Sequence, residues 1–514
     1  MTRRPDKVSR DRYAVVVAMN PPPRYHASMA ETVLPPNFAG LSIHMVGIKG
    51  TGMAALAELL SAGGARITGS DVSDVFYTDA ILGSLGIKAL PFSQDNIRLG
   101  LDLVVHSAAY IRGQHPELVA AEARGIPLMT YTEALGELSR RFDSTGIAGV
   151  HGKTTTTALA GTLLKGAESS AVILAGSAVS GFGDRSTLIL GNRFFVAETC
   201  EYKRNFLSFR PSRIVLTSVE PDHQDYYPDY ESIRDAFLEY ALSLPHGGCL
   251  IYCSDDPGAS EVAKRALDLR PDLDTVPYGW TAQGRWKLSS YTIARECAEF
   301  RFEGMTEPFR VRIPGRHIAL DAAAALALTD RLVLEEFGRP LEGPRLDAVR
   351  RSLEEFSGSR RRCEILGNAQ GILFMDDYGH HPTAIRLTLE GIREFYPDRR
   401  IVVDFMSHTY SRTKALLDEY ADAFSSADEV FLHKIYASAR EKPDGSVTGK
   451  TLFNRMAERR DRVRYFEEPL EALEFLRSEL RPGDLFLTLG AGDNFRLGRT
   501  LFERIKAEQE APTS

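Results

Sequence analysis

The chain has little cysteine for its length, with five residues in 514. Cys249 and Cys253 lie four residues apart, but no second pair follows that would complete a zinc site. The others, Cys200, Cys297 and Cys363, form no paired framework with them. These counts exclude a disulfide-stabilised scaffold and predict reduced thiols in a cytoplasmic protein.

An excess of basic charge is also absent, since the formal net charge is −7. A general nucleic-acid-binding protein usually has a basic face, so no nucleic-acid partner is expected. The sequence contains no run of about 18 apolar residues, which predicts that the chain does not insert into a membrane. No repeat of roughly 20–50 residues is visible, which excludes a solenoid. We expect a globular monomer or homodimer.

A glycine-rich turn is the most informative motif that the chain does contain. A short expected strand leads into Gly149 and Gly152, and a helix then opens with Lys153 and Thr154. The backbone N–H groups of such a turn approach phosphate oxygens, the lysine adds positive charge, and the threonine hydroxyl can bind Mg²⁺. The motif predicts a nucleoside triphosphate site. Because Ile147 replaces the first glycine of the common pattern, an ordinary turn before a helix stays an alternative.

A second glycine-rich turn lies in an expected βαβ unit near the N-terminus. The strand 42–46 leads into Gly47, Gly50 and Gly52, and Asp71 follows about 20 residues later. Nucleotide-binding folds use an acid at this distance to hold a ribose. The glycine order is not the usual dinucleotide order, so an NAD-binding oxidoreductase is an alternative, as is a turn without a ligand.

Two polar residues follow strands of the expected central sheet. Glu198 comes directly after the strand 194–197, and His223 comes after the strand 213–217. Ligands gather at the carboxyl ends of parallel strands, so both side chains should share a cleft with the phosphate-binding turn. A carboxylate, an imidazole and the Thr154 hydroxyl suit Mg²⁺ or Mn²⁺ at an ATP site. Taken singly, Glu198 could equally be a solvated acid at a strand end, and His223 could be a structural histidine.

Further polar clusters follow two strands of the C-terminal part. They are Asp377, Tyr378, His380 and His381 after the strand 372–375, and His408 and Arg412 after the strand 401–404. Adjacent strand ends of this kind predict an acceptor pocket. Alternatively, His381 precedes a proline that starts a helix, and Arg412 is a solvated charge.

Alternating strands and helices predict the α/β fold class with parallel sheets. The length exceeds what one core supports, so several domains are expected. We predict an N-terminal Rossmann-like domain at 41–141, a central P-loop ATPase-like domain at 142–340, and a C-terminal Rossmann-like domain at 341–514. Residues 1–40 are expected to be a flexible extension, because prolines directly follow their short apolar stretch.

Taken together, the motifs resemble those of the Mur ligase family. In chain order they are Gly47–Met53, Gly149–Thr157, Glu220–Tyr227, Pro314–His317, Arg361–Glu364, Asp377–Pro382 and Gly490–Asp493. So many motifs in one order are a stronger signal than any single motif.

The resemblance implies an ATP-dependent, Mg²⁺- or Mn²⁺-dependent ligase of peptidoglycan precursor synthesis. It would join L-alanine to the lactyl carboxylate of UDP-N-acetylmuramate through an acyl phosphate. The N-terminal domain would bind the UDP-sugar, the central domain ATP, and the C-terminal domain the amino acid. A related ligase for another amino acid or a recycled peptide is an alternative, and so is a non-catalytic nucleotide-binding regulator.

The resemblance also assigns residues to each ligand. The UDP-sugar would contact Gly47, Gly50, Thr51, Gly52, Ser70, Asp71 and Ser107. ATP would contact Gly149, His151, Gly152, Lys153, Thr154, Thr155, Asp321, Arg362 and Asp377. The metal ligands would be Thr154, Glu198 and His223. The amino acid would face Tyr378, His380, His408 and Arg412. The catalytic set would be Lys153, Glu198, His223, His380 and Arg412.

The chain departs from the family's pattern in three places. The acidic segment that begins at Glu198 lacks its next acid. Ile318 and Asp321 stand where asparagines are usual, although Asp321 can still accept a hydrogen bond from the adenine amino group. Thr409 replaces an arginine near the amino-acid carboxylate, and losing that bidentate partner can change the acceptor. The activity class is therefore predicted more firmly than L-alanine or ATP specificity.

Overall fold

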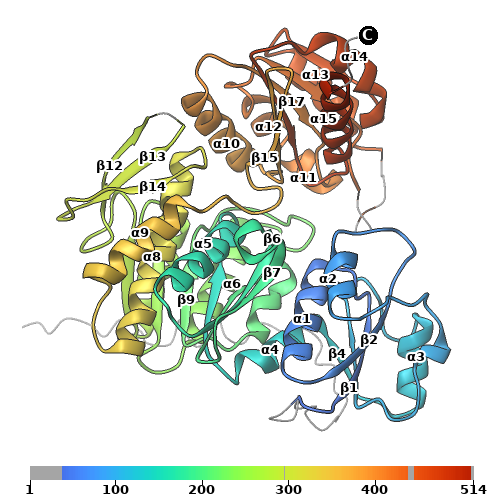
Figure 1. The fold of residues 1–514 in the computed structure, drawn as a ribbon, viewed down its shortest axis with the longest axis vertical. Coiled ribbons are helices and arrows are strands. Elements are labelled where there is room, and N and C mark those ends of the chain that lie inside the picture. Colours follow the sequence, from blue (N-terminus) through green and yellow to red (C-terminus); the bar gives the residue numbers. More distant parts are fainter. Residues whose placement is uncertain (1–37, 295, 438–440, 442–444, 511–514) are drawn as a thin grey trace, which may run out of the picture. The chain divides into compact units, whose positions relative to one another are not determined.

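The computed structural model describes residues 38–294, 296–437, 441 and 445–510. The extension predicted at residues 1–40 therefore lies outside the described residues, apart from its last three. The described residues fall within one compact unit that spans 36–514. Figure 1 colours the chain from blue at its N-terminus to red at its C-terminus. Within the described ranges, none of the helices has the length and apolar character needed to cross a membrane.

The N-terminal part contains a parallel sheet in the order β2-β1-β3-β4. Its strands are β1 (Ser42–Val46), β2 (Arg66–Ser70), β3 (Leu103–His106) and β4 (Leu128–Thr130), and its helices are α1 (Thr51–Ala62), α2 (Thr78–Ser84), α3 (Pro116–Ala123) and α4 (Tyr131–Ser139), with the 3₁₀ turn η3 at Gln94–Asn96. The Gly47–Gly52 turn connects β1 to α1, as the βαβ pattern predicts. This turn therefore lies at the carboxyl edge of the sheet.

The central part is built on a larger sheet in the order β11-β10-β9-β5-β8-β6-β7. Its strands are β5 (Asp143–Ala148), β6 (Ala171–Val179), β7 (Arg185–Ile189), β8 (Phe194–Glu198), β9 (Arg213–Leu216), β10 (Cys249–Cys253) and β11 (Asp274–Tyr278). Its helices are α5 (Lys153–Gly166), α6 (Tyr230–Leu242), α7 (Pro257–Leu269), α8 (Arg316–Phe337) and α9 (Gly343–Glu354), with 3₁₀ turns η4 (Ser180–Phe182) and η5 (Tyr202–Ser208). The β6–β7 pair is antiparallel, unlike the other pairs described in this sheet.

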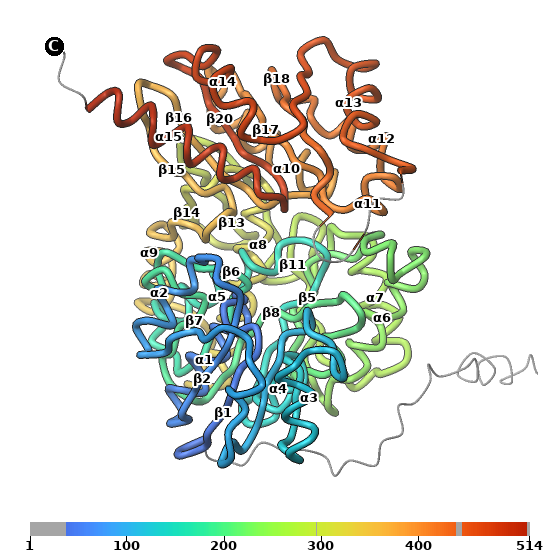
Figure 2. Tube along the Cα trace, turned by 90° about the vertical axis from the view of Figure 1, so that its right-hand side faces the viewer, coloured from blue at the N-terminus to red at the C-terminus, as the bar shows by residue number. Residues whose placement is uncertain are grey.

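Helices cover both faces of the central sheet, and strand alternation decides which residue faces which layer. Ile147 and Val215 pack in the same cluster as α5 and α8, whereas Ala148 and Leu216, their chain neighbours, pack with α6 and α7. Figure 2 shows α6 and α7 side by side in light green. Burying each Val, Ile or Leu side chain contributes about 1.5–3 kcal/mol, so the strand ends that carry the predicted site rest on a rigid core.

A small antiparallel sheet inserted before α8 was not predicted from the sequence. It consists of β12 (Leu288–Ile293), β13 (Ala298–Phe302) and β14 (Phe309–Val311). Phe300, Phe302 and Phe309 are buried and their rings contact one another. This aromatic cluster joins the core beneath α8 and α9.

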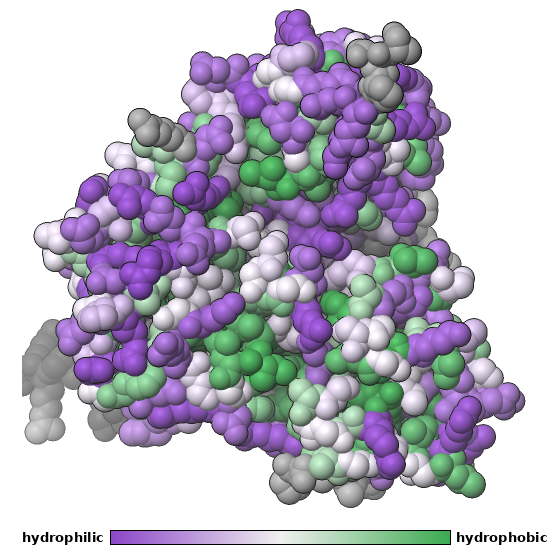
Figure 3. Space-filling model, viewed as in Figure 1, coloured by the Kyte–Doolittle hydropathy of each residue, from purple (hydrophilic) through white to green (hydrophobic). Residues whose placement is uncertain are grey.

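The C-terminal part has a sheet in the order β15-β16-β20-β17-β18-β19, with β15 antiparallel at one edge. The strands are β15 (Glu364–Ala369), β16 (Ile372–Asp377), β17 (Arg400–Phe405), β18 (Glu429–Leu432), β19 (Val463–Tyr465) and β20 (Asp484–Leu489). The helices are α10 (Pro382–Phe395), α11 (Tyr410–Ala415), α12 (Leu417–Asp422), α13 (Gly449–Ala457), α14 (Leu473–Glu479) and α15 (Phe495–Glu510), with the 3₁₀ turn η6 (Pro469–Ala472). The predicted α/β class is confirmed. Figure 3 shows mainly polar side chains on one face, with apolar patches between them.

Candidate functional site

The phosphate-binding turn between β5 and α5 requires its two glycines. Gly149 has φ +144° and Gly152 has φ +78°, a region that residues with a Cβ rarely adopt. A Cβ at the first would collide with the Thr217 hydroxyl, and a Cβ at the second with the Asp321 carboxylate. The segment after β9 holds the turn, because the N–H of His151 donates to Ser218 Oγ at 2.9 Å. The first N–H groups of α5, which have no partner within the helix, therefore lie where the motif predicts phosphate.

Lys153 is folded back onto this turn. Its Nζ donates to Glu201 Oε2 at 2.9 Å, to the Val150 carbonyl at 3.3 Å and to the Gly149 carbonyl. Burial is the largest single influence and lowers the pKa of Lys153, but the nearby Glu201, Cys200 and Glu198 side chains together outweigh it and raise the pKa overall. The same pairing, with His223, lowers the pKa of Glu201 against its own burial. The lysine and the glutamate thus form a charged, buried pair.

Glu201 is a site residue to which the sequence analysis assigned no role. It lies three residues after Glu198, at the start of η5, and its Oε1 is 3.2 Å from His223 Nε2. Lys203 and Arg204 follow in the left-handed region, so the backbone turns sharply there. The available signal was a second glutamate in the segment, but its burial depends on that turn.

The four residues expected at the metal and the triphosphate line one cavity of about 230 Å³: Lys153, Thr154, Glu198 and His223. Thr154 Oγ1 donates to Glu198 Oε2 at 2.8 Å. His223 instead forms a group with Glu201 and Asp222, whose possible ligand atoms lie within 4.8 Å of one another. The three predicted metal ligands therefore line the same cavity, but Thr154 and Glu198 form one group and His223 belongs to another. Their roles as metal ligands stay predictions.

The far end of this cavity is buried and carries unusual protonation states. Asp321 accepts a 3.3 Å hydrogen bond from Thr156, and burial raises its pKa to about 8. Burial also lowers the pKa of His317 to about 4. Thr155 and His151 line the same cavity. Near neutral pH, this end offers a neutral imidazole and a largely protonated carboxyl group.

The turn after β16 is fixed by the Asp377 carboxylate. It accepts hydrogen bonds from the N–H of Gly379 at 2.6 Å and of Cys363 at 2.7 Å. Arg362, in the adjoining loop, reaches the Thr154 hydroxyl at 3.4 Å, and its guanidinium lies over the Tyr378 ring. The C-terminal residues predicted at the nucleotide thus lie beside the central ones. Their contacts with ATP stay predictions.

His380 and Arg412 lie where the central and C-terminal parts meet. The Arg412 guanidinium is bound by Asp222, with Nε and Nη2 2.8 and 2.7 Å from Oδ1, and it donates to the His408 carbonyl at 2.6 Å. Despite burial, Arg412 holds the pKa of Asp222 well below its usual range. Burial, followed by the Arg412 charge, lowers the pKa of His380 well below normal. The His380 and His408 rings lie 5.8 Å apart.

The predicted UDP-sugar residues divide into cavity-lining and structural ones. Thr51 lines a large cavity of about 1130 Å³ that also reaches Glu198, and Tyr77 donates to its hydroxyl at 3.0 Å. Asp71 accepts from the N–H of Lys49 at 2.7 Å and so shapes the turn before α1. Ser70 is fully buried and donates to Glu117.

The three glycines of the turn between β1 and α1 differ in whether a Cβ would fit at their positions. Gly47 has φ +81°, and a Cβ there would approach Tyr110 to 2.6 Å. A Cβ on Gly52 would lie 2.8 Å from Tyr131. Gly50 has no such restriction, since its closest neighbour would be 3.5 Å away. The N–H of Ser107 donates to the Val46 carbonyl at 3.0 Å. Contacts of these residues with a UDP-sugar stay predictions.

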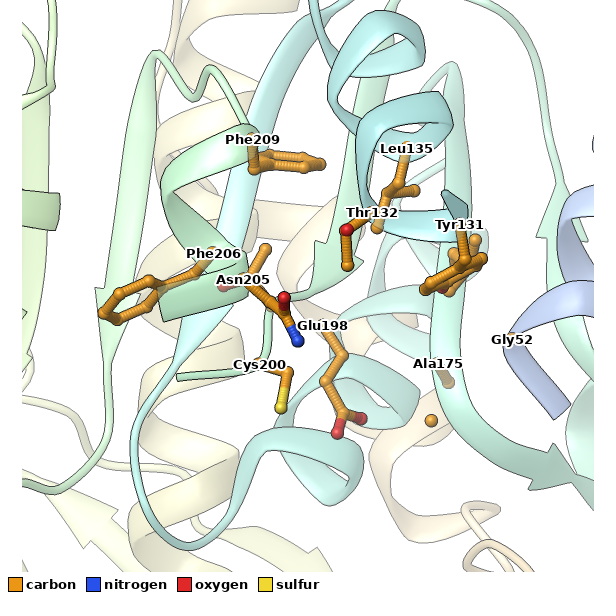
Figure 4. Close-up of a pocket in the computed structure, with 13 residues that line it drawn as sticks. Gly52, Tyr131, Thr132, Leu135, Ala175, Glu198, Cys200, Asn205, Phe206 and Phe209 are labelled. Carbon is orange, nitrogen blue, oxygen red and sulfur yellow. The ribbon is translucent and has the colours of Figure 1, made fainter. Parts of the chain in front are cut away.

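A smaller pocket of about 130 Å³ has walls from both the N-terminal and the central part. It is lined by Gly52 from the N-terminal turn and by Glu198 from the metal side, with apolar walls from α4 and η5. Figure 4 shows the Glu198 carboxylate next to Cys200, with Phe206, Phe209 and Leu135 farther away. A ligand that touches both the first turn and the metal side has apolar surface available between them.

Comparisons with known proteins identify the family of the chain. Three family models match in order: the Mur ligase family catalytic domain at 42–143, the Mur ligase middle domain at 147–329, and the Mur ligase glutamate ligase domain at 361–492. The chain is 53% identical to UDP-N-acetylmuramate–L-alanine ligase of Treponema pallidum, covering 93% of this chain and 100% of the relative. It is 38% identical to the protein of the same name in Borreliella afzelii, covering 89% and 97%.

A solved structure gives the same architecture. The UDP-N-acetylmuramate–alanine ligase MurC of Thermotoga maritima superposes with a TM-score of 0.74 and 26% identity, covering 91% of this chain and all of the other. The predicted fold of three α/β domains is confirmed. The boundaries predicted at 41–141, 142–340 and 341–514 stay predictions.

Proposed function

The chain belongs to the Mur ligase family, and on that basis we propose that it joins L-alanine to the lactyl carboxylate of UDP-N-acetylmuramate with ATP. This reaction supplies a peptidoglycan precursor and so serves the cell wall. The observation that carries the proposal is the single cavity lined by Lys153, Thr154, Glu198 and His223. The 53% identity to a ligase of this name supports the same substrates. Nothing comparable supports the oxidoreductase or the non-catalytic regulator.

The residues fit ATP with Mg²⁺. The Thr154 hydroxyl and the Glu198 carboxylate adjoin at 2.8 Å, and hard oxygen ligands of this kind suit Mg²⁺. The neighbouring His223 group offers further ligand atoms. Bound Mg²⁺ supplies positive charge that stabilises the transferring phosphoryl group. The glycine turn at Gly149 and Gly152, together with the N-terminus of α5, is suited to phosphate oxygens.

The chain's own residues position the reacting groups and balance their charge. Lys153 exchanges its contacts with Glu201 and the turn carbonyls for phosphate oxygens, so its charge stabilises the transferred group. The lactyl carboxylate then attacks the γ-phosphate, ADP leaves, and an acyl phosphate forms. Because an acyl phosphate hydrolyses, water has to be excluded, and the contact of Arg412 with Asp222 closes the C-terminal part over the cavity.

His380 is suited to receive the amino group. Its Nδ1 lies 3.0 Å from the Tyr378 carbonyl, which can only accept, so Nδ1 carries the hydrogen and Nε2 keeps a lone pair. The lowered pKa keeps this ring neutral at pH 7. Nε2 therefore accepts a hydrogen bond from the amine and aims its nitrogen lone pair at the acyl phosphate.

Two departures from the family's pattern make the finer specificity part of the proposal. A protonated Asp321 both donates and accepts, which matches the adenine edge and favours ATP over GTP. Thr409, in place of an arginine, donates to Glu441 at 2.9 Å. Without the arginine, the amino-acid carboxylate loses one charged partner, so an acceptor other than L-alanine, such as another small amino acid or a peptide, stays an alternative.

The test is a coupled assay with ATP, Mg²⁺, UDP-N-acetylmuramate and single amino acids. We expect phosphate release and a product whose mass equals the UDP-sugar plus alanine minus water. Glycine, serine and peptides serve as competing acceptors, and Lys153→Ala serves as the negative control, since it should stop turnover while still binding the UDP-sugar. Absence of phosphate release with every acceptor contradicts the proposal.

The setting of the enzyme is also part of the proposal. All five cysteines are free thiols, which suits a reducing cytoplasm. We expect the enzyme to act there as a monomer or homodimer, without nucleic acid and without membrane insertion.

A further inference from the structure

A cluster of two histidines and a glutamate lies beside the phosphate-binding turn, and the proposed reaction uses none of the three as a metal ligand. His151 belongs to the turn, Glu220 follows β9, and His381 precedes α10. One possible ligand atom from each residue lies within 4.8 Å of the other two. We propose that these three side chains form a transition-metal site, distinct from the Mg²⁺ site, which takes Zn²⁺ or a similar ion.

The two imidazoles are spaced as ligands of one ion. Their ring centroids lie 5.0 Å apart. With Zn–N bonds of about 2.1 Å and a tetrahedral angle, two imidazoles on one Zn²⁺ have centroids about 5 Å apart. The rings come from different parts of the chain, 230 positions apart. Their spacing is therefore a product of the fold and not of one local turn.

The Glu220 carboxylate lies between the two rings. Its Oε1 contacts His151 Nε2 and lies 3.9 Å from His381 Nδ1. Its Oε2 accepts a 3.0 Å hydrogen bond from Thr383, which fixes the group's orientation. One carboxylate oxygen is thus presented to both imidazoles, while the other is held by a neighbour. Such outer hydrogen bonds are what orients a metal-binding carboxylate.

The hydrogen positions on His381 suit a metal at Nδ1. The Thr383 N–H points at Nδ1 over a long 3.3 Å contact, so this nitrogen presents a lone pair and Nε2 carries the hydrogen. The ring is 5% exposed, and Nε2 has no hydrogen-bond partner. A metal at Nδ1 replaces one weak contact without moving the hydrogen, and His151 binds in the form with its hydrogen on Nδ1.

The ligand chemistry separates this site from the Mg²⁺ site. Two imidazoles with one carboxylate favour Zn²⁺, Ni²⁺ or Cu²⁺, whereas Mg²⁺ prefers oxygen ligands such as Thr154 and Glu198. Because His151 precedes Gly152 in the phosphate-binding turn, an ion held there competes with Mg·ATP. Because His381 lies in the C-terminal part, the same ion also ties that part to the central one. Occupancy should therefore inhibit the proposed ligase.

The experiment is a Co²⁺ titration of the nucleotide-free protein in excess Mg²⁺. Mg²⁺ fills the oxygen-ligand site, and Co²⁺ bound by imidazole in a tetrahedral site gives visible absorption bands that Zn²⁺ abolishes. We expect one Co²⁺ per chain, at least tenfold weaker binding in Glu220→Gln and in His381→Gln, and unchanged binding in the surface control His246→Gln. Thermal unfolding of each variant without metal shows whether it is folded, and His151→Gln replaces any variant that is not.

The possible outcomes distinguish failure of the metal-site proposal from failure of the proposed ligase function. Wild-type protein that binds no Co²⁺ under these conditions, or folded Glu220→Gln and His381→Gln that bind it normally, overturns the proposal. The readout does not require turnover, so an inactive protein that still binds Co²⁺ would reject the proposed function alone. Addition of Zn²⁺ to the ligase assay should raise the apparent KM for ATP in wild type and much less in the variants.

Discussion

At the scale of single residues, buried charges need partners, and those partners define the site. Lys153 and Glu201 neutralise each other within 2.9 Å, and His223 adds a second contact to the same carboxylate. Losing one member of such a group leaves the others buried without compensation. The motif Lys153-Thr154 was visible in the sequence, but its partner Glu201 was not, because pairing depends on the turn that follows β8.

Glu201→Gln tests this pairing. The amide keeps the shape but removes the charge that holds Lys153 and His223, so we expect at least tenfold lower kcat and about 1–3 kcal/mol lower free energy of unfolding. Denaturant unfolding and initial rates measure both. Glu239→Gln is the matched control, because Glu239 pairs with Arg204 at the surface and such pairs contribute at most about 1 kcal/mol. Equal effects of the two substitutions would contradict the assignment.

The raised pKa of Asp321 makes the free energy of unfolding depend on pH. Its pKa is about 8 in the folded protein, against a reference value near 3.8. Between these values the folded chain holds a proton that the unfolded chain has lost. The stabilisation is therefore complete below about pH 4 and disappears as the pH rises through 8.

Asp321→Asn removes this titration. From pH 5 to pH 8, wild type should lose of the order of 3 kcal/mol of unfolding free energy relative to the variant. Urea unfolding at several pH values measures the difference, with the surface substitution Asp235→Asn as control. Parallel profiles for wild type and Asp321→Asn would show that burial does not hold the proton there.

At the scale of elements, the strand-turn-helix unit at β5 and α5 was predictable and most of its supports were not. The glycines at 149 and 152 indicated a turn, and both have positive φ. The reason for the first, the collision that a Cβ would make with Thr217 just after β9, is a tertiary feature. The same limit explains the missed sheet β12–β14, whose buried residues belong to a core cluster that also contains residues of α8 and α9. By contrast, the apolar runs in the sequence correctly predicted the strands that are buried on both faces.

Gly149→Ala tests the turn as an element. A Cβ there meets the Thr217 hydroxyl and sits at an unfavourable φ, so we expect a loss of about 1–3 kcal/mol in stability and weaker ATP binding. Gly181→Ala is the control, because Gly181 has ordinary φ and nothing within 4 Å of a built Cβ. Calorimetric unfolding and nucleotide titration measure the two effects. Wild-type affinity in Gly149→Ala would contradict the role of the turn.

At the scale of the whole molecule, one buried ion pair connects sequence positions 190 residues apart. Asp222 follows β9 in the central part, and Arg412 lies in α11 of the C-terminal part. The sequence placed Arg412 near the reacting groups and gave Asp222 only as part of the Glu220–Tyr227 motif, so it gave no means to pair the two. Long-range pairs of this kind are set by the packing of domains, which a single sequence does not encode in any local pattern.

A double-mutant cycle measures this connection. Asp222→Asn and Arg412→Gln each leave a buried partner unpaired, so each should cost several kcal/mol, while the double variant costs less than the sum. We expect a coupling energy of at least about 1.5 kcal/mol, both in unfolding and in kcat/KM. The surface pair Arg477 and Glu508 serves as control, with coupling near zero. Additive costs at Asp222 and Arg412 would mean that they do not act as a pair.

The resting position of Lys153 has a consequence for which anions the empty enzyme retains. Glu201 already neutralises the charge of Lys153. A small anion such as sulfate or inorganic phosphate would have to break this ion pair and would form only about one new contact with the lysine in return. A triphosphate brings several oxygens at once and can also bind the N–H groups at the start of α5, which have no partner within the helix. The contact between Lys153 and Glu201 thus favours a polyanion such as a nucleoside triphosphate over abundant short anions.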